Sequence, residues 1–205
     1  MPLTLLIATT NPAKEERLRR LCGSAPLMLL GPGDVAPTPD IDEDGNSHMG
    51  NAIRKAVGWS RVCDCAVIAS DGGLSIPAMG YGWQSLLTRR GTGGEVSDEQ
   101  HATRLLGRMR ELTGPNRNAH WTEGIAIARG GELLGSWEAN GLHGHIAESY
   151  APPANAVSGF WVSGLWQTVD GIRYGELSDA ELAALGDPWA ELSDPVQDML
   201  RRLAG

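Results

Sequence analysis

The chain has 205 residues, of which 41% are hydrophobic, and this length suits one domain with a full core. Seventeen basic and 25 acidic residues give a net charge of −8. We therefore expect no binding to nucleic acid or to anionic membranes, because both need a cationic surface. No apolar run approaches the ~20 residues of a membrane span, and the amino-terminal residues lack the basic region of a signal peptide, so the sequence predicts a cytoplasmic protein.

Apolar runs that alternate with amphipathic segments predict strands that alternate with helices. The first half of the chain predicts a strand at 3–9, a helix starting at 11–12, a strand at 27–30, an acidic loop at 31–45, a helix at 47–62, and a strand at 66–69 that ends in the Ser-Asp-Gly-Gly segment at 70–73. The second half predicts a helix at 97–112, a hairpin of strands at 121–128 and 132–140, and short helices near 178–185 and 195–203. This order favours an α/β fold with a mixed sheet.

Three cysteines provide little evidence for a metal or a disulfide framework. Cys22 lies in a helical pattern, whereas Cys63 and Cys65 flank Asp64. A lone C-x-C motif is poor evidence for zinc, and an odd count argues against paired cysteines. We expect reduced, partly buried thiols.

The basic residues are almost all arginine, with Lys14 and Lys55 as the two lysines among the 17. The ammonium of lysine is a compact point charge, whereas the guanidinium of arginine is planar and forked. Lysine at these two positions therefore favours a site that needs a point charge. With two instances, chance is the alternative explanation.

The first candidate site follows the amino-terminal strand, at Thr9, Asn11, Pro12 and Lys14. Asn11 is a good N-cap and Pro12 a good first helical residue. A helix start behind a buried strand presents free backbone N–H groups, and Lys14 adds a positive charge for a phosphate. The alternative is ordinary capping beside an exposed lysine.

The second candidate combines Glu43 of the acidic loop with Asn51 and Lys55. Asn51 and Lys55 are four residues apart and share a helix face, an arrangement that suits phosphate oxygens. The alternative is a solvated polar face, as most such pairs are.

The third candidate is Asp71, which follows the strand at 66–69 and precedes Gly72 and Gly73. Ligands collect at the carboxyl ends of strands in α/β sheets, and a carboxylate there can hold a divalent cation or polarise a water molecule. A plain Asp-Gly turn is the alternative.

In chain order, T-x-N-x-x-K at 9–14, N-A-x-x-K-A at 51–56 and D-x-G-L at 71–74 resemble the inosine triphosphate pyrophosphatase family, over residues 3 to about 137. The resemblance assigns metal binding to Glu43 and Asp71, with Asp71 also accepting the proton of the attacking water. It places in the substrate site the residues Thr9, Asn11, Lys14, Asn51, Lys55, Gly72, Arg89 and Phe160.

The resemblance implies a Mg²⁺-dependent hydrolase that converts a nucleoside triphosphate to the monophosphate and pyrophosphate. It further implies one domain over residues 1–205, with an elongated mixed sheet, flanking helices and two lobes around a nucleotide cleft, and a homodimer.

The chain departs from the family pattern in both halves of the site. Ser70, Asp71 and Gly72 stand where the family usually has two aspartates and a serine, and Gly50 stands where it usually has glutamate. The family's late lysine and S-H-R signature have no counterpart at 182–189. We therefore expect altered base selectivity, and the alternative function is a non-catalytic nucleotide-binding or interaction protein that kept the fold.

Overall fold

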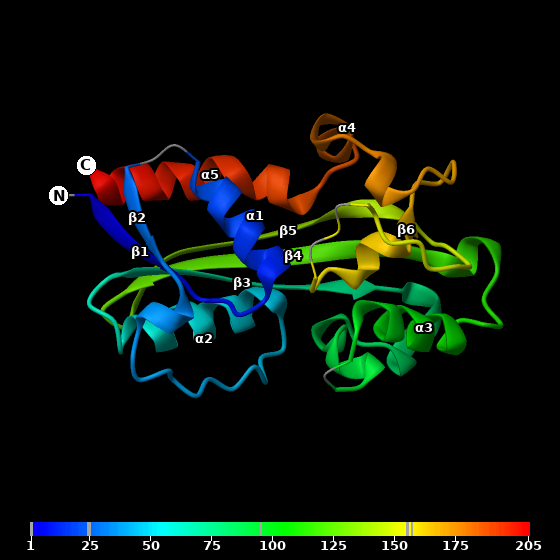
Figure 1. Ribbon diagram of the computed structural model, residues 1–205, viewed down its shortest axis with the longest axis horizontal. Coiled ribbons are helices and arrows are strands. Elements are labelled where there is room, and N and C mark those ends of the chain that lie inside the picture. Colours follow the sequence, from blue (N-terminus) through cyan, green and yellow to red (C-terminus); the bar gives the residue numbers. More distant parts are fainter. Residues whose placement is uncertain (1, 24–25, 95, 155, 157) are drawn as a thin grey trace. The chain divides into compact units, whose positions relative to one another are not determined.

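The computed structural model describes residues 2–23, 26–94, 96–154, 156 and 158–205 (Figure 1). Its sheet has the strand order β2-β1-β3-β4-β5-β6. The strands are β1 (Leu3–Ile7), β2 (Leu27–Leu30), β3 (Ala66–Ser75), β4 (Asn118–Arg129), β5 (Glu132–Ile146) and β6 (Trp166–Gln167). The α-helices are α1 (Pro12–Cys22), α2 (His48–Ser60), α3 (Asp98–Arg108), α4 (Asp179–Ala184) and α5 (Pro188–Ala204). Strand β1 pairs in parallel with β2 and β3, whereas β5 and β6 are antiparallel, so the sheet is mixed as predicted.

The chain forms two compact units, and β3, β4 and β5 contribute residues to both. Unit 1 contains Met1–Gly72, Glu123–Ala139 and Trp189–Gly205, and unit 2 contains Gly73–Thr122 and Asn140–Pro188. In unit 1, side chains of alternate strand residues enter two cores, because successive residues of a strand point to opposite faces of the sheet. Helices α1 and α5 cover one face, and α2 covers the other (Figure 1).

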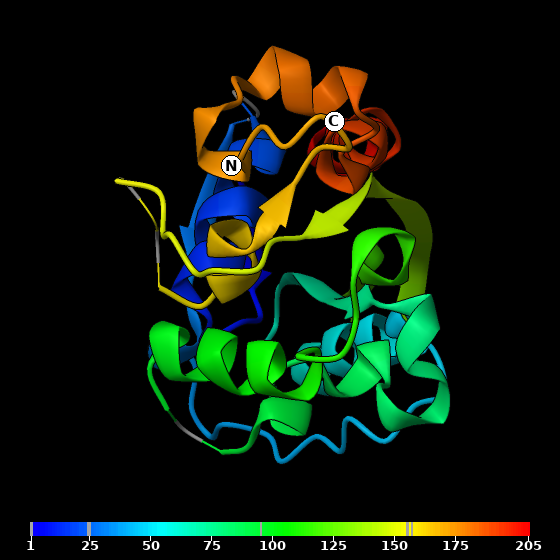
Figure 2. The same cartoon turned by 90° about the vertical axis from the view of Figure 1, so that its right-hand side faces the viewer.

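Unit 2 has a core of its own, built from α3, the segment around Trp161, and parts of β4 and β5. The α3 helix faces the viewer in Figure 2. It begins with a capping box of Ser97 and Gln100, and His101 in its first half stacks on Trp161 with ring centroids 5.6 Å apart. The Asp98 carboxylate also accepts a hydrogen bond from the Gly159 N–H at 2.9 Å. These contacts attach α3 to the segment that carries Phe160.

Three expectations from the sequence are wrong. The strand expected to end in the Ser-Asp-Gly-Gly segment at 70–73 continues through it to Ser75, so Asp71 is a strand residue and the alternative of a plain Asp-Gly turn is wrong. The last helix starts at Pro188 despite Pro195 within it, because an apolar stripe on α5 packs into the core of unit 1. Cys63 and Cys65 are joined by a disulfide, since the turn before β3 brings their Cα atoms to 5.4 Å, a separation that a disulfide spans. Cys22 is a free, buried thiol as expected.

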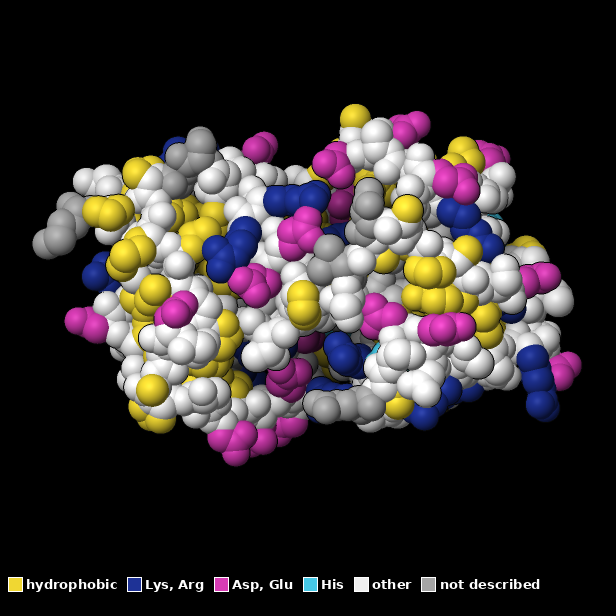
Figure 3. All heavy atoms as spheres, in the orientation of Figure 1, with side chains coloured by type: hydrophobic (Ala, Val, Ile, Leu, Met, Phe, Trp, Pro, Cys, Tyr) yellow, Lys and Arg dark blue, Asp and Glu magenta, His cyan; other side chains and the backbone are white. Residues whose placement is uncertain are grey.

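Charges of both signs are interspersed on the face shown in Figure 3, with acidic side chains in magenta and basic ones in dark blue. Among the described residues, no helix combines the length and apolar content that a membrane span requires.

Candidate active site

Asp71 lies at the centre of a cluster of charged residues in unit 1. Its carboxylate oxygen Oδ1 is 3.1 Å from the Nζ atom of Lys55 and 3.9 Å from that of Lys14. Asp71 is 8% exposed, so both contacts form in a largely desolvated environment. The two lysines of the chain therefore converge on one carboxylate oxygen, from α1 and from α2.

The start of α1 is capped by Asn11. The Asn11 Oδ1 atom accepts hydrogen bonds from the backbone N–H groups of Ala13 at 3.0 Å and Lys14 at 3.3 Å. Thr9 shapes the same turn, because its Oγ1 atom accepts from the Asn11 N–H at 3.2 Å. The expectation of free N–H groups at this helix start is thus wrong for Ala13 and Lys14, since the cap occupies them. The positive group that the turn brings to the cluster is the Lys14 side chain.

The acidic loop and α2 bring two further predicted residues to Asp71. Asn51 is buried, accepts the Gly45 N–H on its Oδ1 atom at 2.9 Å, and donates from Nδ2 to Asp71 Oδ2 at 3.4 Å. Glu43 is more exposed, and its Oε1 atom lies 3.0 Å from Lys55 Nζ. Lys55 therefore lies between the carboxylates of Glu43 and Asp71.

Two charged or polar residues of the cluster were missed from the sequence. His48 is hydrogen-bonded to Asp71, with 2.8 Å between Nδ1 and Oδ2, and Glu123 places Oε1 at 3.8 Å from Lys14 Nζ. Both side chains are buried, Glu123 completely. Spacing could have identified His48, because it lies three residues before Asn51 on the same helix face. The signal for Glu123 was a single carboxylate inside an apolar strand pattern.

The ionisation of the cluster follows from these contacts. Burial alone would raise the pKa of Asp71, but the His48 hydrogen bond and the charges of Lys14 and Lys55 hold this pKa well below its usual range. Burial alone would lower the pKa of Lys55, but the charges of Asp71 and Glu43 raise it above its usual value. Asp71 is therefore an anion and Lys55 a cation at neutral pH.

The remaining predicted residues have different surroundings. Gly72 follows Asp71 in β3 and is the last residue of that segment of unit 1. Arg89 and Phe160 belong to unit 2, where Arg89 is exposed next to a short 3-10 turn. Phe160 packs its ring edge-to-face with Trp121 and Tyr174 at centroid distances of 5.2 and 5.5 Å. Their part in the same site stays a prediction.

The fit of Mg²⁺ can be judged from the donor set. Glu43 and Asp71 each have a carboxylate oxygen within 3.1 Å of the same ammonium, so both can approach one small cation. Among the described residues, no three His, Cys, Asp or Glu side chains are arranged to hold a metal ion. Because Mg²⁺ in nucleotide sites is held by one or two carboxylates together with phosphate oxygens and water, this pair fits such an ion only when a phosphate supplies further oxygens.

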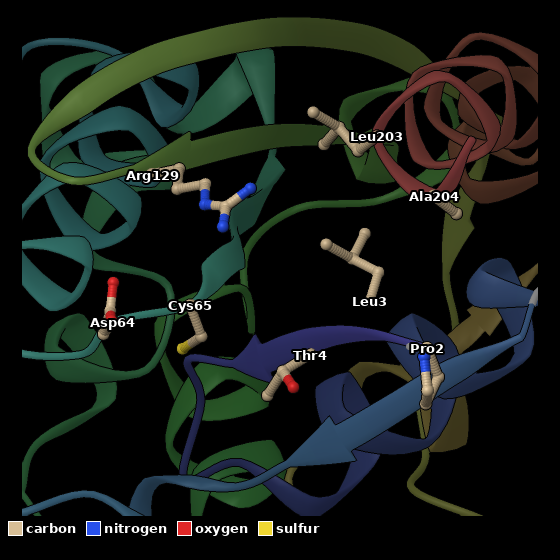
Figure 4. Close-up of a pocket in the computed structure, with 8 residues that line it drawn as sticks. All are labelled: Pro2, Leu3, Thr4, Asp64, Cys65, Arg129, Leu203 and Ala204. Carbon is tan, nitrogen blue, oxygen red and sulfur yellow. The ribbon is translucent and has the colours of Figure 1, made fainter.

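A separate pocket of unit 1 lies at the opposite ends of the strands (Figure 4). It has a volume of about 250 Å³, and its lining residues are Pro2, Leu3, Thr4, Asp64, Cys65, Arg129, Leu203 and Ala204. These residues lie at or just before the starts of β1 and β3, at the carboxyl end of β4 and in the last turn of α5. Lys14, in contrast, follows the carboxyl end of β1, and Asp71 lies in β3 three residues beyond Ile68, the partner of the last residue of β1.

Comparison with known proteins finds relatives that are named dITP/XTP pyrophosphatases. The chain is 30% identical over 161 residues to a dITP/XTP pyrophosphatase of Anaeromyxobacter dehalogenans (strain 2CP-C), covering 65% of this chain and 68% of the relative. It is 31% identical over 140 residues to a dITP/XTP pyrophosphatase of Xanthomonas campestris pv. campestris (strain 8004), covering 65% and 69%.

Solved structures have the same fold. A HAM1 protein from Coxiella burnetii superposes with a TM-score of 0.76 at 21% identity, covering 96% of this chain and 99% of that one. The Ham1 protein of Staphylococcus aureus gives a TM-score of 0.73 at 20% identity, covering 95% and 98%. The predicted α/β fold with a mixed sheet and flanking helices is confirmed.

The model of the Ham1 family matches residues 5–156, which is most of the chain and includes every residue of the Asp71 cluster. The resemblance predicted from the three motifs is therefore confirmed, and the related proteins reported above are named pyrophosphatases. The chain belongs to the Ham1 family.

Proposed function

We propose that the chain hydrolyses nucleoside triphosphates to the nucleoside monophosphate and pyrophosphate, and that the Asp71 cluster is its active site. The observation that carries this proposal is the convergence of Lys14 and Lys55 on one carboxylate oxygen. A triphosphate brings about four negative charges to an acidic protein, so the attraction has to be local. Two lysine side chains held side by side supply it.

In the proposed reaction, Asp71 orients a water molecule for attack on the α-phosphorus, and the bond from that phosphorus to the bridging oxygen of pyrophosphate breaks. The water proton passes to Asp71, directly or through a second water molecule. The lysines stabilise the charge of the departing pyrophosphate. When the substrate binds, its phosphates draw the ammonium groups of Lys14 and Lys55 away from Asp71. The loss of these neighbouring positive charges raises the pKa of Asp71 and makes it a stronger base.

We propose Mg²⁺ as the cofactor, with Glu43 and Asp71 as its protein ligands. When bound, Mg²⁺ would neutralise phosphate charge and polarise the α-phosphoryl group. Thr9 and Asn11 hold the turn that presents Lys14, and Asn51 holds Asp71. We also propose that Gly72, Arg89 and Phe160 bind the substrate.

The proposed substrates are non-canonical purine nucleotides, because the relatives above are named dITP/XTP pyrophosphatases. We propose weak discrimination between bases, with inosine triphosphate favoured over ATP by less than about 10² in kcat/KM, since polar contacts to the base give a site its large selectivity. The segment at 182–189 lacks the family's lysine, histidine and arginine. Part of it packs by its main chain against β5, where the Leu142 N–H donates to the Gly186 carbonyl at 3.1 Å.

We also propose a cytoplasmic homodimer. The cytoplasm holds the nucleotide pool that such an enzyme would act on. Light scattering on the purified protein measures the oligomeric state independently of activity, and a monomer at micromolar concentration would contradict the dimer.

The test of the function is a panel of inosine, xanthosine, adenosine and guanosine triphosphates with Mg²⁺, scored for pyrophosphate and for orthophosphate. We expect pyrophosphate as the first product and no turnover in excess EDTA. Orthophosphate as the first product, or full activity in EDTA, would contradict the proposal. Nucleotide binding without turnover would instead support the non-catalytic alternative.

A further inference from the structure

We propose that His48 is a positioning residue that fixes the orientation of the Asp71 carboxylate, so that Oδ1 faces the two lysines. This inference rests on the proposed function of the Asp71 site. His48 is 5% exposed, and its Nδ1 atom lies 2.8 Å from Asp71 Oδ2. This contact is shorter than those of Asp71 with Asn51, Lys55 and Lys14.

The two oxygens of Asp71 have different partners. Oδ2 accepts from His48 at 2.8 Å and from Asn51 at 3.4 Å, whereas Oδ1 faces Lys55 at 3.1 Å and Lys14 at 3.9 Å. An ionised carboxylate can only accept hydrogen bonds, so the hydrogen between His48 and Asp71 resides on Nδ1. The ring therefore acts as a donor to Oδ2 and leaves Oδ1 for cations or water.

His48 can fix the orientation of the Asp71 carboxylate because several contacts hold the first turn of α2 in place. The Ser47 side chain caps the turn by accepting the Gly50 N–H at 3.0 Å. The Met49 N–H donates to the Glu138 carboxylate on β5 at 2.9 Å. Gly124 on β4 lets the helix start approach closely, since a Cβ atom there would lie 2.7 Å from the Met49 nitrogen.

Without His48, Oδ2 would keep only the longer contact from Asn51 among those described, and the carboxylate could rotate about its Cβ–Cγ bond. A rotated carboxylate still neutralises Lys14 and Lys55, so substrate affinity would change little. The water molecule or cation at Oδ1 would lose its alignment, and turnover would fall. The role therefore predicts an effect on kcat and not on KM.

The experiment compares His48→Leu, which removes the donor, with His48→Asn, whose side-chain amide can donate from nearly the same position. We expect kcat to fall about 10–100-fold in His48→Leu with KM changed by less than about 3-fold, as for other residues that orient a reacting group. His48→Asn should recover most of the lost kcat. Arg54→Ala is the matched control on the same helix, because Arg54 pairs with Asp44 at the surface. It should retain the wild-type kcat.

Equal losses in His48→Leu and His48→Asn, or a kcat unchanged in both, would overturn the proposal. A second measurement needs no turnover and no leucine variant. Long-range ¹H–¹⁵N spectra of the wild type labelled at histidine should show hydrogen on His48 Nδ1, with a signal that shifts in Asp71→Asn. Hydrogen on Nε2 alone would refute the contact. A wild type that hydrolyses no nucleotide but keeps this signal would instead refute the proposed function.

Discussion

The ammonium of Lys14 lies 3.8 Å from the carboxylate of Glu123, a side chain that is completely buried in β4. The same ammonium is 3.9 Å from Asp71, so Lys14 links two carboxylates that come from different strands. A buried anion costs free energy unless a cation compensates it. Through its contact with Glu123, Lys14 therefore contributes to the stability of the fold as well as to the candidate site.

Replacing Lys14 with methionine should destabilise the protein by about 2 kcal/mol, because it leaves Glu123 buried with one fewer counter-charge. Adding Glu123→Gln should recover a large part of this loss. Urea denaturation of the wild type, both single variants and the double variant gives the coupling free energy. Strictly additive changes in the free energy of unfolding would show that the two side chains do not interact.

Replacing Lys55 with alanine should weaken triphosphate binding about 10–100-fold, since a charge-assisted hydrogen bond to phosphate is worth about 1.5–3 kcal/mol. Binding of inosine monophosphate should fall by less, because fewer phosphate charges then lack a partner. Calorimetric titration with both nucleotides measures the two effects. Arg54→Ala, one residue away and facing Asp44, is the control and should bind both nucleotides normally. Equal losses for both nucleotides would exclude a specific role for Lys55 at the β- or γ-phosphate.

Asp71→Asn should lower kcat by about 10²–10⁴-fold, the range expected on removing a group that accepts or directs a proton. The amide keeps the size of the side chain, and circular dichroism at the assay temperature checks that the variant is folded. Asp44→Asn, in the exposed acidic loop, serves as the control for loss of a carboxylate. An Asp71→Asn variant with wild-type kcat would reduce Asp71 to a structural partner of the lysines.

Cys22 should react slowly with iodoacetamide in the folded protein at pH 8. Burial raises the pKa of this thiol to about 11, with a smaller opposing effect of Arg19, and the thiolate is the reactive species. Alkylation should therefore speed up as the pH rises toward 11, whereas in urea it should already be fast at pH 8. Mass spectrometry of the Cys22 peptide follows the rate. Equal rates in the folded and unfolded protein at pH 8 would contradict the burial of this thiol.

The two lysines and Asp71, which the sequence singles out separately, lie together in the structure, whereas the backbone around Asp71 differs from the prediction. The rarity of lysine in an arginine-rich chain identified Lys14 and Lys55, and the structure brings both to one oxygen. Residues 70–73 continue β3 instead of ending it, because pairing within the sheet outweighs the local turn preference of Asp-Gly-Gly. Propensity describes a residue and its neighbours in the chain, whereas strand pairing depends on a distant segment.

The partners of the predicted residues were harder to predict, since they come from distant parts of the chain. Glu123 is separated from Lys14 by more than half of the chain, and a carboxylate in a strand pattern does not reveal which cation it faces. His48 was within reach of helix periodicity. A histidine on an amphipathic helix is usually a core or surface residue, so its residue type alone does not indicate a place in the site.

Because glycine has no side chain, Gly124 limits which amino acids this position of β4 can accept. A Cβ atom at this position would lie within 3.0 Å of the Met49 nitrogen, the Met49 Cα atom and the His48 carbonyl carbon. These are main-chain atoms, so a neighbouring side chain cannot turn aside to make room. Position 123 of β4 thus needs a negative charge that faces Lys14, whereas position 124 needs a residue without a Cβ atom. A designer who transplanted this site into another scaffold would have to copy the bare glycine along with the charged residues.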